Sequence, residues 1–239
     1  MKYKTENQKL KSANRRELLK LLPVAALGAF AIPKLQKPLL KEGLAFSDWM
    51  SGKFFRSHHL APNFDNSQLT PLSKFYVNTY DVDDPEVDLD QWALTVGGAV
   101  QHPGEYKLDS FKTLPKFTQN TRHVCVEGWD VIGRFGGARI SDFLKLVGAD
   151  TSARFITVEC ADDYYESIDM ATALHPQSLL CYEMYDQPLT REHGAPLRLR
   201  MPTKIGYKQA KYLTSLTVSN VLTKKGYWED QGYSDFYSL

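Results

Sequence analysis

One cysteine near the middle of the chain stands among side chains that could activate it. Cys125 lies in the segment 122–130, which reads RHVCVEGWD. A thiolate there could ligate a soft metal or attack a substrate, and the nearby Arg122, His123 and Arg134 would favour the charged form. His123 and Cys125 by themselves do not predict a zinc site, because a structural zinc site needs four ligands. On chemistry alone, a lone cysteine on a strand is more often a buried, unreactive side chain.

The other cysteines and the missing motifs narrow the chemistry. Cys160 and Cys181 lie within apolar, strand-like segments, and an odd total of three cysteines does not build a disulfide framework. The sequence contains no phosphate-binding loop, no dinucleotide-binding glycine motif, no C-x-x-C, no H-E-x-x-H and no G-x-S-x-G. Nucleotide hydrolysis, Rossmann-type redox chemistry and classical zinc catalysis are therefore disfavoured.

Four further motifs follow Cys125 along the chain. They read YYESIDM at 164–170, LLCYEMYDQPL at 179–189, REHGAPLR at 191–198 and PTKIGYKQAKYL at 202–213. In this order they resemble the molybdenum domain of the sulfite oxidase family, whose members carry a Y-x-x-S-I strand, an L-L-A-Y-E-M-N-G-Q-P-L hairpin, an H-G-x-P-x-R turn and a G-x-x-x-x-K-W-L strand. The resemblance covers about residues 75–230 and implies an enzyme with a molybdenum-molybdopterin cofactor.

The resemblance also implies roles for individual residues. Cys125 falls where the family places the thiolate that ligates molybdenum, and a soft sulfur donor suits that metal. Arg198 and Lys211 suit the phosphate of the cofactor, because arginine can bind phosphate through two hydrogen bonds and lysine supplies a point charge. The segment YVNTYD at 76–81 is similar to a Y-N-N-F-Y-E segment of the family, with Val77 in place of one asparagine. The residues implied to bind the cofactor are Asn78, Tyr80, Asp81, Cys160, His193, Arg198, Gln209, Ala210 and Lys211.

Two features bear on catalysis and substrate. Tyr164 matches the tyrosine that faces the equatorial oxygen of the metal in sulfite oxidases, where its hydroxyl could donate to that oxygen or to the substrate. Sulfite oxidases follow the cysteine with an arginine-containing stretch, whereas this chain has Glu127 and Asp130, which would repel an anion. The C-V-E-x-W pattern is instead similar to the catalytic subunit of periplasmic methionine sulfoxide reductase, whose substrate is neutral. Arg134 could partly offset the two acids, so sulfite stays open as an alternative substrate.

The N-terminal segment resembles a targeting signal. Residues 1–31 hold seven Lys or Arg against two acidic residues. The pair Arg15 and Arg16 precedes an apolar run at 21–32, which is shorter than the roughly 20 residues that span a bilayer. The pattern resembles a twin-arginine export signal and predicts a periplasmic or otherwise exported protein. The alternative is that this segment forms an amphipathic N-terminal helix of the folded domain. The molybdopterin-binding domain itself is expected at 32–239.

The composition is that of one sizeable globular domain. The 239 residues are 43% hydrophobic and 24% charged, and the net charge of +1 argues against a basic nucleic-acid-binding domain. Strand-like runs without a regular βαβ rhythm predict a mostly β, α+β domain, which the resemblance makes the sulfite oxidase molybdopterin-binding fold. A proline-containing extended segment is expected at 32–74. Strands are expected at 92–97, 124–127, 155–161, 164–170, 179–185, 197–201 and 212–218, and helices at 46–54, 108–114 and 140–147, the last capped by Ser141 and ended by Gly148.

The implied reaction is oxygen-atom transfer on a sulfoxide-type or other small substrate. Because the sequence has no C-x-x-C-H haem motif, a separate electron carrier is expected, either a membrane haem protein or a soluble cytochrome. A monomer is expected, because the sequence after Trp228 is too short for the dimerisation domain of sulfite oxidases, and the small net charge predicts no nucleic-acid partner. Two other classes stay open: a metal-free cysteine enzyme with His123 as its base, and a non-catalytic binding module that retained the fold.

Overall fold

A computed structural model of the chain describes residues 42–43, 46–47, 49–50, 59–79 and 83–235. The chain divides into two compact units, Met1–Trp49 and Met50–Leu239, and the strands given below belong to the second. The predicted targeting signal at 1–31 lies outside the described residues, as does part of the helix predicted at 46–54, whose described residues are helical. Within the described residues, no helix has both the length and the apolar character needed to cross a membrane.

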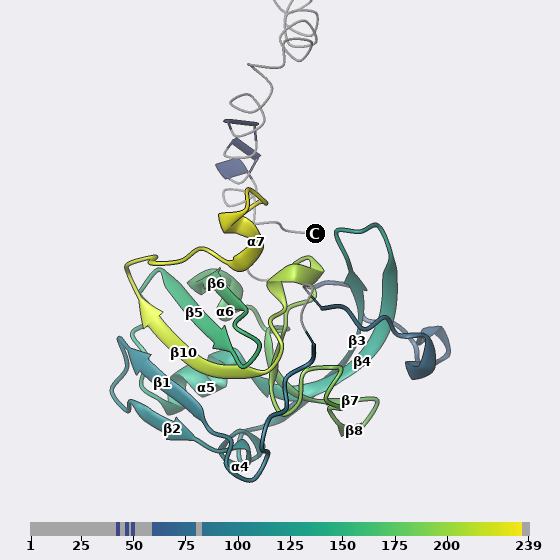
Figure 1. Cartoon of the computed structure of the whole chain (residues 1–239), viewed down its shortest axis with the longest axis horizontal. Helices are drawn as coiled ribbons and strands as arrows, with labels where there is room; N and C mark the ends of the chain where they lie inside the picture. The colour runs from purple at the N-terminus through teal and green to yellow at the C-terminus, as the bar shows by residue number, and fades with distance from the viewer. Residues whose placement is uncertain (1–41, 44–45, 48, 51–58, 80–82, 236–239) are drawn as a thin grey trace, which may run out of the picture. The chain divides into compact units, whose positions relative to one another are not determined.

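The first sheet holds five strands in the order β2-β1-β10-β5-β6 (Figure 1). β1 pairs with β10 in parallel, and the other neighbours are antiparallel. Alternate side chains of β5 face the core, so Ile156, Val158 and Cys160 are buried together. The strands are β1 (Leu94–Gly98), β2 (Gly104–Tyr106), β5 (Phe155–Cys160), β6 (Tyr165–Asp169) and β10 (Leu213–Ser219).

The second sheet is built on a long hairpin of β3 (Lys116–Val124) and β4 (Asp130–Arg139). β4 also pairs with β7 (Leu179–Met184), and β7 pairs with β8 (Gln187–Pro188) and β9 (Arg198–Arg200). The register between β4 and β7 shifts at Gly136 and Gly137. A Cβ at Gly137 would lie 2.2 Å from the carbonyl oxygen of Leu180, so the two backbones approach closely only because this residue has no side chain.

Short helices complete the core. In α5 (Ile140–Leu146), Ile140, Phe143 and Leu144 are buried, because residues three and four apart share one face of a helix. The helix begins after Arg139 rather than at Ser141, which corrects the predicted cap, and Gly148 follows its end with a φ of 61° as expected for a helix stop. The others are α4 (Leu108–Lys112), α6 (Met170–Ala173) and α7 (Tyr227–Asp230).

The predicted class, a mostly β, α+β domain, is confirmed. The strand predicted at 124–127 is wrong, because β3 ends at Val124 and a turn follows it. The β3–β4 hairpin has a weak sequence signal for two reasons: β3 buries a polar run, and β4 contains three glycines. The other predicted strands correspond to β1, β5, β6, β7, β9 and β10, and the predicted helices at 108–114 and 140–147 to α4 and α5.

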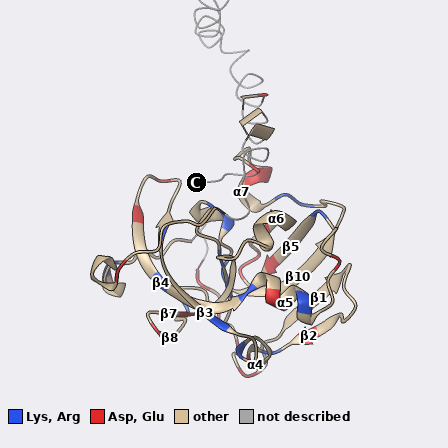
Figure 2. Ribbon diagram, turned by 180° about the vertical axis from the view of Figure 1, so that it is seen from behind, with Lys and Arg blue, Asp and Glu red and all other residues tan. Residues whose placement is uncertain are grey.

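Residues 59–79 run along the β3–β4 hairpin as an irregular segment with two 3₁₀ turns, η2 (Asn66–Gln68) and η3 (Leu72–Lys74). The N–H of Phe64 donates to the carbonyl of Asn120 and that of Thr70 to the carbonyl of Ile132, both at 2.9 Å. This matches the extended segment predicted at 32–74 over residues 59–74, whereas residues 42–43 in the same range are helical. Acidic and basic residues are interspersed over the strands (Figure 2), in keeping with the small net charge.

Candidate active site

Cys125 occupies the first position of the tight turn between β3 and β4. Its backbone N–H donates to the carbonyl of Trp129 at 2.9 Å, and the N–H of Gly128 donates to the Cys125 carbonyl at 3.1 Å. Gly128 has a φ of 94°, in the left-handed region that glycine adopts without steric cost. These bonds close the turn and fix Cys125, which is only 8% exposed.

An amide, a carboxylate and an indole surround the sulfur. Asn78 Nδ2 donates to Cys125 Sγ at 3.6 Å and to Glu127 Oε2 at 3.3 Å. The same Glu127 oxygen lies 3.7 Å from the sulfur and accepts a 2.8 Å hydrogen bond from Trp129 Nε1. The Trp129 ring packs against Tyr76, with ring centroids 4.7 Å apart. The acid next to Cys125 is therefore held in place from two sides.

The arginines that were expected to favour the thiolate bind elsewhere. Arg122 pairs with Asp130 at 2.6 Å, and Arg134 Nε donates to the two carboxylate oxygens of Asp186 at 2.9 and 2.8 Å. Burial above all, together with the Glu127 charge, raises the pKa of the Cys125 thiol. The expectation that Arg134 offsets the acids near Cys125 is therefore wrong, and nearby cations do not activate this thiol.

His123 is buried beside the Cys125 turn and is held neutral. Its Nδ1 lies 3.2 Å from Arg200 Nη1 and accepts a hydrogen bond, since a guanidinium can only donate. Burial, reinforced by the Arg200 charge, lowers the pKa of His123 well below its ordinary value. The recorded hydrogen-bond partners of the Cys125 sulfur are Asn78 and Glu127, so the His123–Cys125 pair of a metal-free cysteine enzyme has no direct bond to support it.

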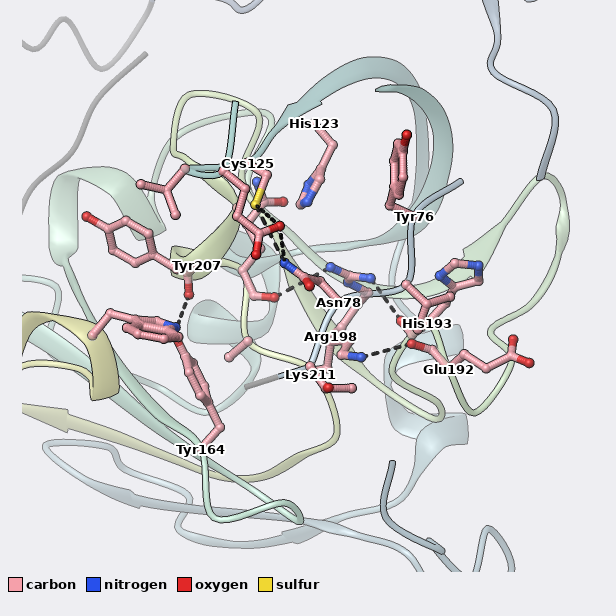
Figure 3. A pocket seen from close by; sticks show the side chains of 18 of the residues that line it. Tyr76, Asn78, His123, Cys125, Tyr164, Glu192, His193, Arg198, Tyr207 and Lys211 are labelled. Carbon is pink, nitrogen blue, oxygen red and sulfur yellow. Dashed lines mark hydrogen bonds between the residues drawn. The ribbon is translucent and has the colours of Figure 1, made fainter. Parts of the chain in front are cut away.

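A cavity of about 310 Å³ extends from the Cys125 turn to the chain between residues 192 and 211 (Figure 3). That wall includes a residue of β9 and the short 3₁₀ helix η4 (Gly206–Lys208). In Figure 3 the Cys125 sulfur and the Asn78 amide point toward each other, with Arg198 and Lys211 beyond them. The volume is within the range of roughly 300–1,000 Å³ seen for ligand pockets. The predicted residues that line it are Asn78, Cys125, Tyr164, His193, Arg198, Gln209, Ala210 and Lys211.

β9 carries two buried guanidinium groups, of which Arg198 lines the cavity and Arg200 does not. Arg198, 6% exposed, donates to the carbonyl of His193 at 2.9 Å. Arg200 is fully buried and donates to Thr121 Oγ1 at 2.8 Å and to the Arg122 carbonyl at 2.7 Å. None of the hydrogen bonds recorded for either guanidinium goes to a carboxylate, and burial lowers the pKa of both, that of Arg200 to about 9. A buried cation without an acidic partner is costly, so Arg198 favours an anionic ligand at this wall.

Lys211 adds a second positive group to the cavity wall. Its Nζ donates to the Glu192 carbonyl at 2.9 Å and to Tyr212 Oη at 3.0 Å, and lies 3.5 Å from Asp84 Oδ1. Burial is the main reason that its pKa is lowered. Gly194, with a φ of 97°, packs directly on this side chain, because a Cβ there would lie 2.8 Å from Lys211 Cβ. The glycine of the H-G-x-P-x-R motif thus makes room for the lysine of the next motif.

These side chains fit a molybdenum cofactor that brings its own sulfur ligands and a phosphate. Cys125 supplies one soft donor on one side of the cavity, and Arg198 and Lys211 supply positive charge on the other. In the part of the chain that the structure describes, no three His, Cys, Asp or Glu side chains group into a metal site. A metal whose remaining ligands belong to an organic cofactor needs only the one thiolate that Cys125 offers.

Not every predicted cofactor residue is at the cavity. Cys160 does not line it, because the alternation along β5 turns its side chain into the core, and its predicted cofactor contact is corrected to core packing. Tyr80 and Asp81 lie outside the described residues.

Tyr164 lines the cavity with its hydroxyl already engaged. The hydroxyl donates to the Tyr207 carbonyl at 2.7 Å, and burial raises its pKa. A hydroxyl has a single proton to donate. Donation to a substrate oxygen, as predicted, therefore requires this bond to break, and the catalytic role of Tyr164 stays a prediction.

Several residues that sequence reasoning did not single out also line the cavity. Trp129 shares the segment 122–130 with Cys125, and Tyr207 shares the segment 202–213 with Gln209. Their positions within these motifs could have marked them as site residues. Phe75 packs edge-on against His193, with ring centroids 5.5 Å apart, and Trp228 and Tyr233 close the C-terminal side. No local pattern marks these aromatic residues, because only the path of the chain brings them to the cavity.

Known proteins resemble this chain in sequence and fold. The sequence model of the family described as the oxidoreductase molybdopterin binding domain matches residues 81–228 of this chain. The chain is 46% identical over 193 residues to the candidate protein-methionine-sulfoxide reductase subunit YedZ1 of Azospira oryzae, covering 80% of this chain and 72% of that protein. It is 26% identical over 245 residues to the protein-methionine-sulfoxide reductase catalytic subunit MsrP of Xanthomonas axonopodis pv. citri, covering 93% and 75%.

Two more distant relatives extend the likeness. The sulfite oxidase of Arabidopsis thaliana is 32% identical over 190 residues, covering 64% of this chain and 48% of that protein. The crystal structure of the sulfane dehydrogenase SoxCD from Paracoccus pantotrophus matches with a TM-score of 0.54 at 19% identity, covering 58% of this chain and 40% of that chain. The predicted fold is confirmed by this structural match.

Proposed function

The chain belongs to the oxidoreductase molybdopterin binding domain family and is a molybdopterin-dependent oxidoreductase, and from this premise we propose that it removes an oxygen atom from a sulfoxide-type or other small neutral substrate. The bound cofactor supplies the two-electron oxygen-atom transfer. Reduction of a sulfoxide consumes two electrons and two protons and releases a sulfide and water. The observation that carries the proposal is the Glu127 carboxylate, 3.7 Å from the Cys125 sulfur.

The residues of this chain have separate tasks in the proposal. Cys125 holds the metal, and the Asn78 amide directs an N–H at its sulfur, 3.6 Å away. Hydrogen bonds to sulfur ligands are one of the means by which proteins tune a metal centre. Arg198 and Lys211 bind the negatively charged end of the cofactor, whose charge replaces the carboxylate partners that the buried guanidinium of Arg198 lacks.

The surroundings of the sulfur favour a neutral substrate. Glu127 lines the cavity beside Cys125, and a second anion close to it would be repelled even after solvent screening. Tyr76 and Val126 expose 58% and 45% of their surface and line the same cavity. A neutral sulfoxide with apolar substituents suits this combination, whereas sulfite does not.

Electron supply and location are part of the same proposal. The three cysteines at 125, 160 and 181 include no haem attachment motif, which supports a separate haem protein, membrane-bound or soluble, as the electron carrier.

The twin arginines ahead of an apolar run support export to the periplasm. Replacing Arg15 and Arg16 with lysines in an expressing cell should leave the protein in the cytoplasm, while Lys9→Arg should not; fractionation that finds both variants exported would remove this support.

The substrate is tested by steady-state assays of cofactor-loaded protein. Methionine sulfoxide is supplied with a reduced viologen dye as electron donor, and sulfite is supplied with ferricyanide as electron acceptor. We expect turnover of the sulfoxide and little or none of sulfite. Turnover of sulfite alone would replace the proposal with a sulfite dehydrogenase of the same fold, and metal-free protein that turns over a substrate until Cys125 is alkylated would replace it with a cysteine enzyme.

A further inference from the structure

Lys208 is the one residue of the 206–211 segment that does not line the cavity. Its side chain turns away from it and is 2% exposed. The ammonium donates to Glu166 Oε1 at 2.6 Å, to the Ser167 carbonyl at 3.0 Å and to Glu229 Oε1. An ammonium has three N–H donors, so this set uses all of them.

The cluster of Lys208, Glu166 and Glu229 joins three elements that are far apart in the sequence. Glu166 lies in β6, Lys208 in η4 and Glu229 in α7. The side chains of both acids are fully buried, and Oε2 of each has no hydrogen-bond partner among the described residues. One ammonium balances two buried acids when one acid keeps its proton, and burial raises the pKa of Glu166 well above its ordinary value.

Two members of the cluster, Lys208 and Glu229, are next to cavity residues in the sequence. Tyr207 and Gln209 flank Lys208, and Trp228 precedes Glu229; all three line the cavity. Tyr207 Oη also donates to the Ser234 carbonyl at 2.8 Å, which adds a second link between η4 and the C-terminal segment. Buried ions tolerate little loss of geometry, so a shift of η4 must be followed by α7.

We propose that Lys208 is a positioning residue that couples cofactor binding at Gln209–Lys211 to the C-terminal wall of the cavity, formed by Trp228 and Tyr233. The anionic end of the cofactor restricts the motion of the segment that carries Lys211, and the buried ion pairs of the cluster extend this restriction to α7. The C-terminal wall is then complete only when the cofactor is in place. This inference rests on the cofactor site and is independent of which substrate the enzyme takes.

Hydrogen exchange followed by mass spectrometry tests the coupling on full-length protein with and without cofactor, with molybdenum content measured on each sample. In the wild type, amides at 227–235 should exchange at least about tenfold more slowly when the cofactor is bound. In the triple variant Glu166→Gln, Lys208→Met, Glu229→Gln, which removes all three ionisable groups at similar volume, this difference should vanish while thermal unfolding stays cooperative. Lys224→Met, which removes an exposed lysine 3.5 Å from Glu159, is the matched control and should behave as wild type.

Gly226→Ala provides a second route that removes no charge. Its methyl group would lie 2.0 Å from Glu229 Oε2 and 2.7 Å from Glu166 Oε1, so it must displace the cluster. This variant is used if the triple variant does not fold or takes up no molybdenum, and it should also lose the cofactor-dependent protection of 227–235. The inference is wrong if wild-type protection is independent of the cofactor, or if either cluster variant keeps the wild-type response. Neither result would bear on sulfoxide turnover.

Discussion

The Cys125 sulfur and the Glu127 carboxylate lie 3.7 Å apart, so a molecule that reaches the sulfur also meets the acid. Asn78 bridges the two groups, with its Nδ2 at 3.6 and 3.3 Å. Two single-residue changes therefore separate metal binding from substrate selection.

Cys125→Ser should abolish molybdenum binding, because a hydroxyl is a harder and poorer ligand for this metal than a thiolate. Elemental analysis should find about one metal per chain in the wild type and at least about tenfold less in the variant. Cys160→Ser is the matched control, because this side chain faces the core, and it should keep its metal while losing about 1 kcal/mol of stability. Loss of molybdenum from Cys160→Ser would restore the cofactor contact that the sequence predicted.

Glu127→Gln should improve the use of sulfite, because it removes a negative charge beside the sulfur and keeps the shape and an acceptor for Trp129 Nε1. We expect kcat/KM for sulfite to rise by about tenfold, with a smaller change for methionine sulfoxide. Asp130→Asn makes the same change of charge at a residue that pairs with Arg122 and does not line the cavity, and it should have little effect. An equal response of the two variants would show that overall charge, and not Glu127, sets the preference.

At the scale of elements, the site depends on the second sheet. The β3–β4 hairpin presents the Cys125 turn, and β9, which pairs with β7 on the far side of β4, presents Arg198. The close approach of β4 and β7 at Gly137 sets the spacing between these two sides of the site.

Gly137→Ala should destabilise the fold, because its methyl group would lie 2.2 Å from the Leu180 carbonyl oxygen and 2.7 Å from Cys181 Cα. Overpacking of this kind costs about 1–3 kcal/mol in the free energy of unfolding. Urea unfolding of the variant and the wild type measures this loss. Gly97→Ala in β1 adds the same methyl where nothing lies within 4 Å and should change stability by less than about 0.5 kcal/mol. Equal effects of the two substitutions would contradict the close β4–β7 contact.

At the scale of the whole molecule, a buried histidine makes stability depend on pH. The N–H of Gln177 donates to His175 Nδ1 at 3.2 Å, and His175 Nε2 lies 3.1 Å from the His59 carbonyl, an arrangement that suits the neutral ring protonated on Nε2. Burial lowers the pKa of His175. Below about pH 6.5 the unfolded chain binds a proton that the folded chain does not. The free energy of unfolding therefore decreases as the pH is lowered, by up to about 1.4 kcal/mol per pH unit.

Urea unfolding at pH 7.5 and 5.5 checks this contribution. The loss of stability between the two values should be smaller in His175→Gln than in the wild type. His102→Gln, at an exposed position, is the control and should keep the wild-type difference. A wild-type difference in the His175 variant would show that other groups account for the pH dependence.

Local patterns were sufficient for much of the fold. Strand-like runs predicted β5 and β6, and the stop at Gly148 marked the end of α5. The β3–β4 hairpin escaped prediction, because its buried Gln119, Asn120 and Thr121 break the apolar pattern, and each side chain has a hydrogen-bond partner outside the hairpin.

By itself the sequence determined the family, the cofactor class and the residues at both ends of the site, because ordered motifs and residue chemistry are properties of the chain. Only the tertiary structure decided that Arg134 binds Asp186, that Cys160 belongs to the core, and that Lys208 faces two buried acids. Those outcomes depend on which strands pair and which face each side chain takes. Such long-range contacts are fixed by packing of the whole chain, and no local pattern records them.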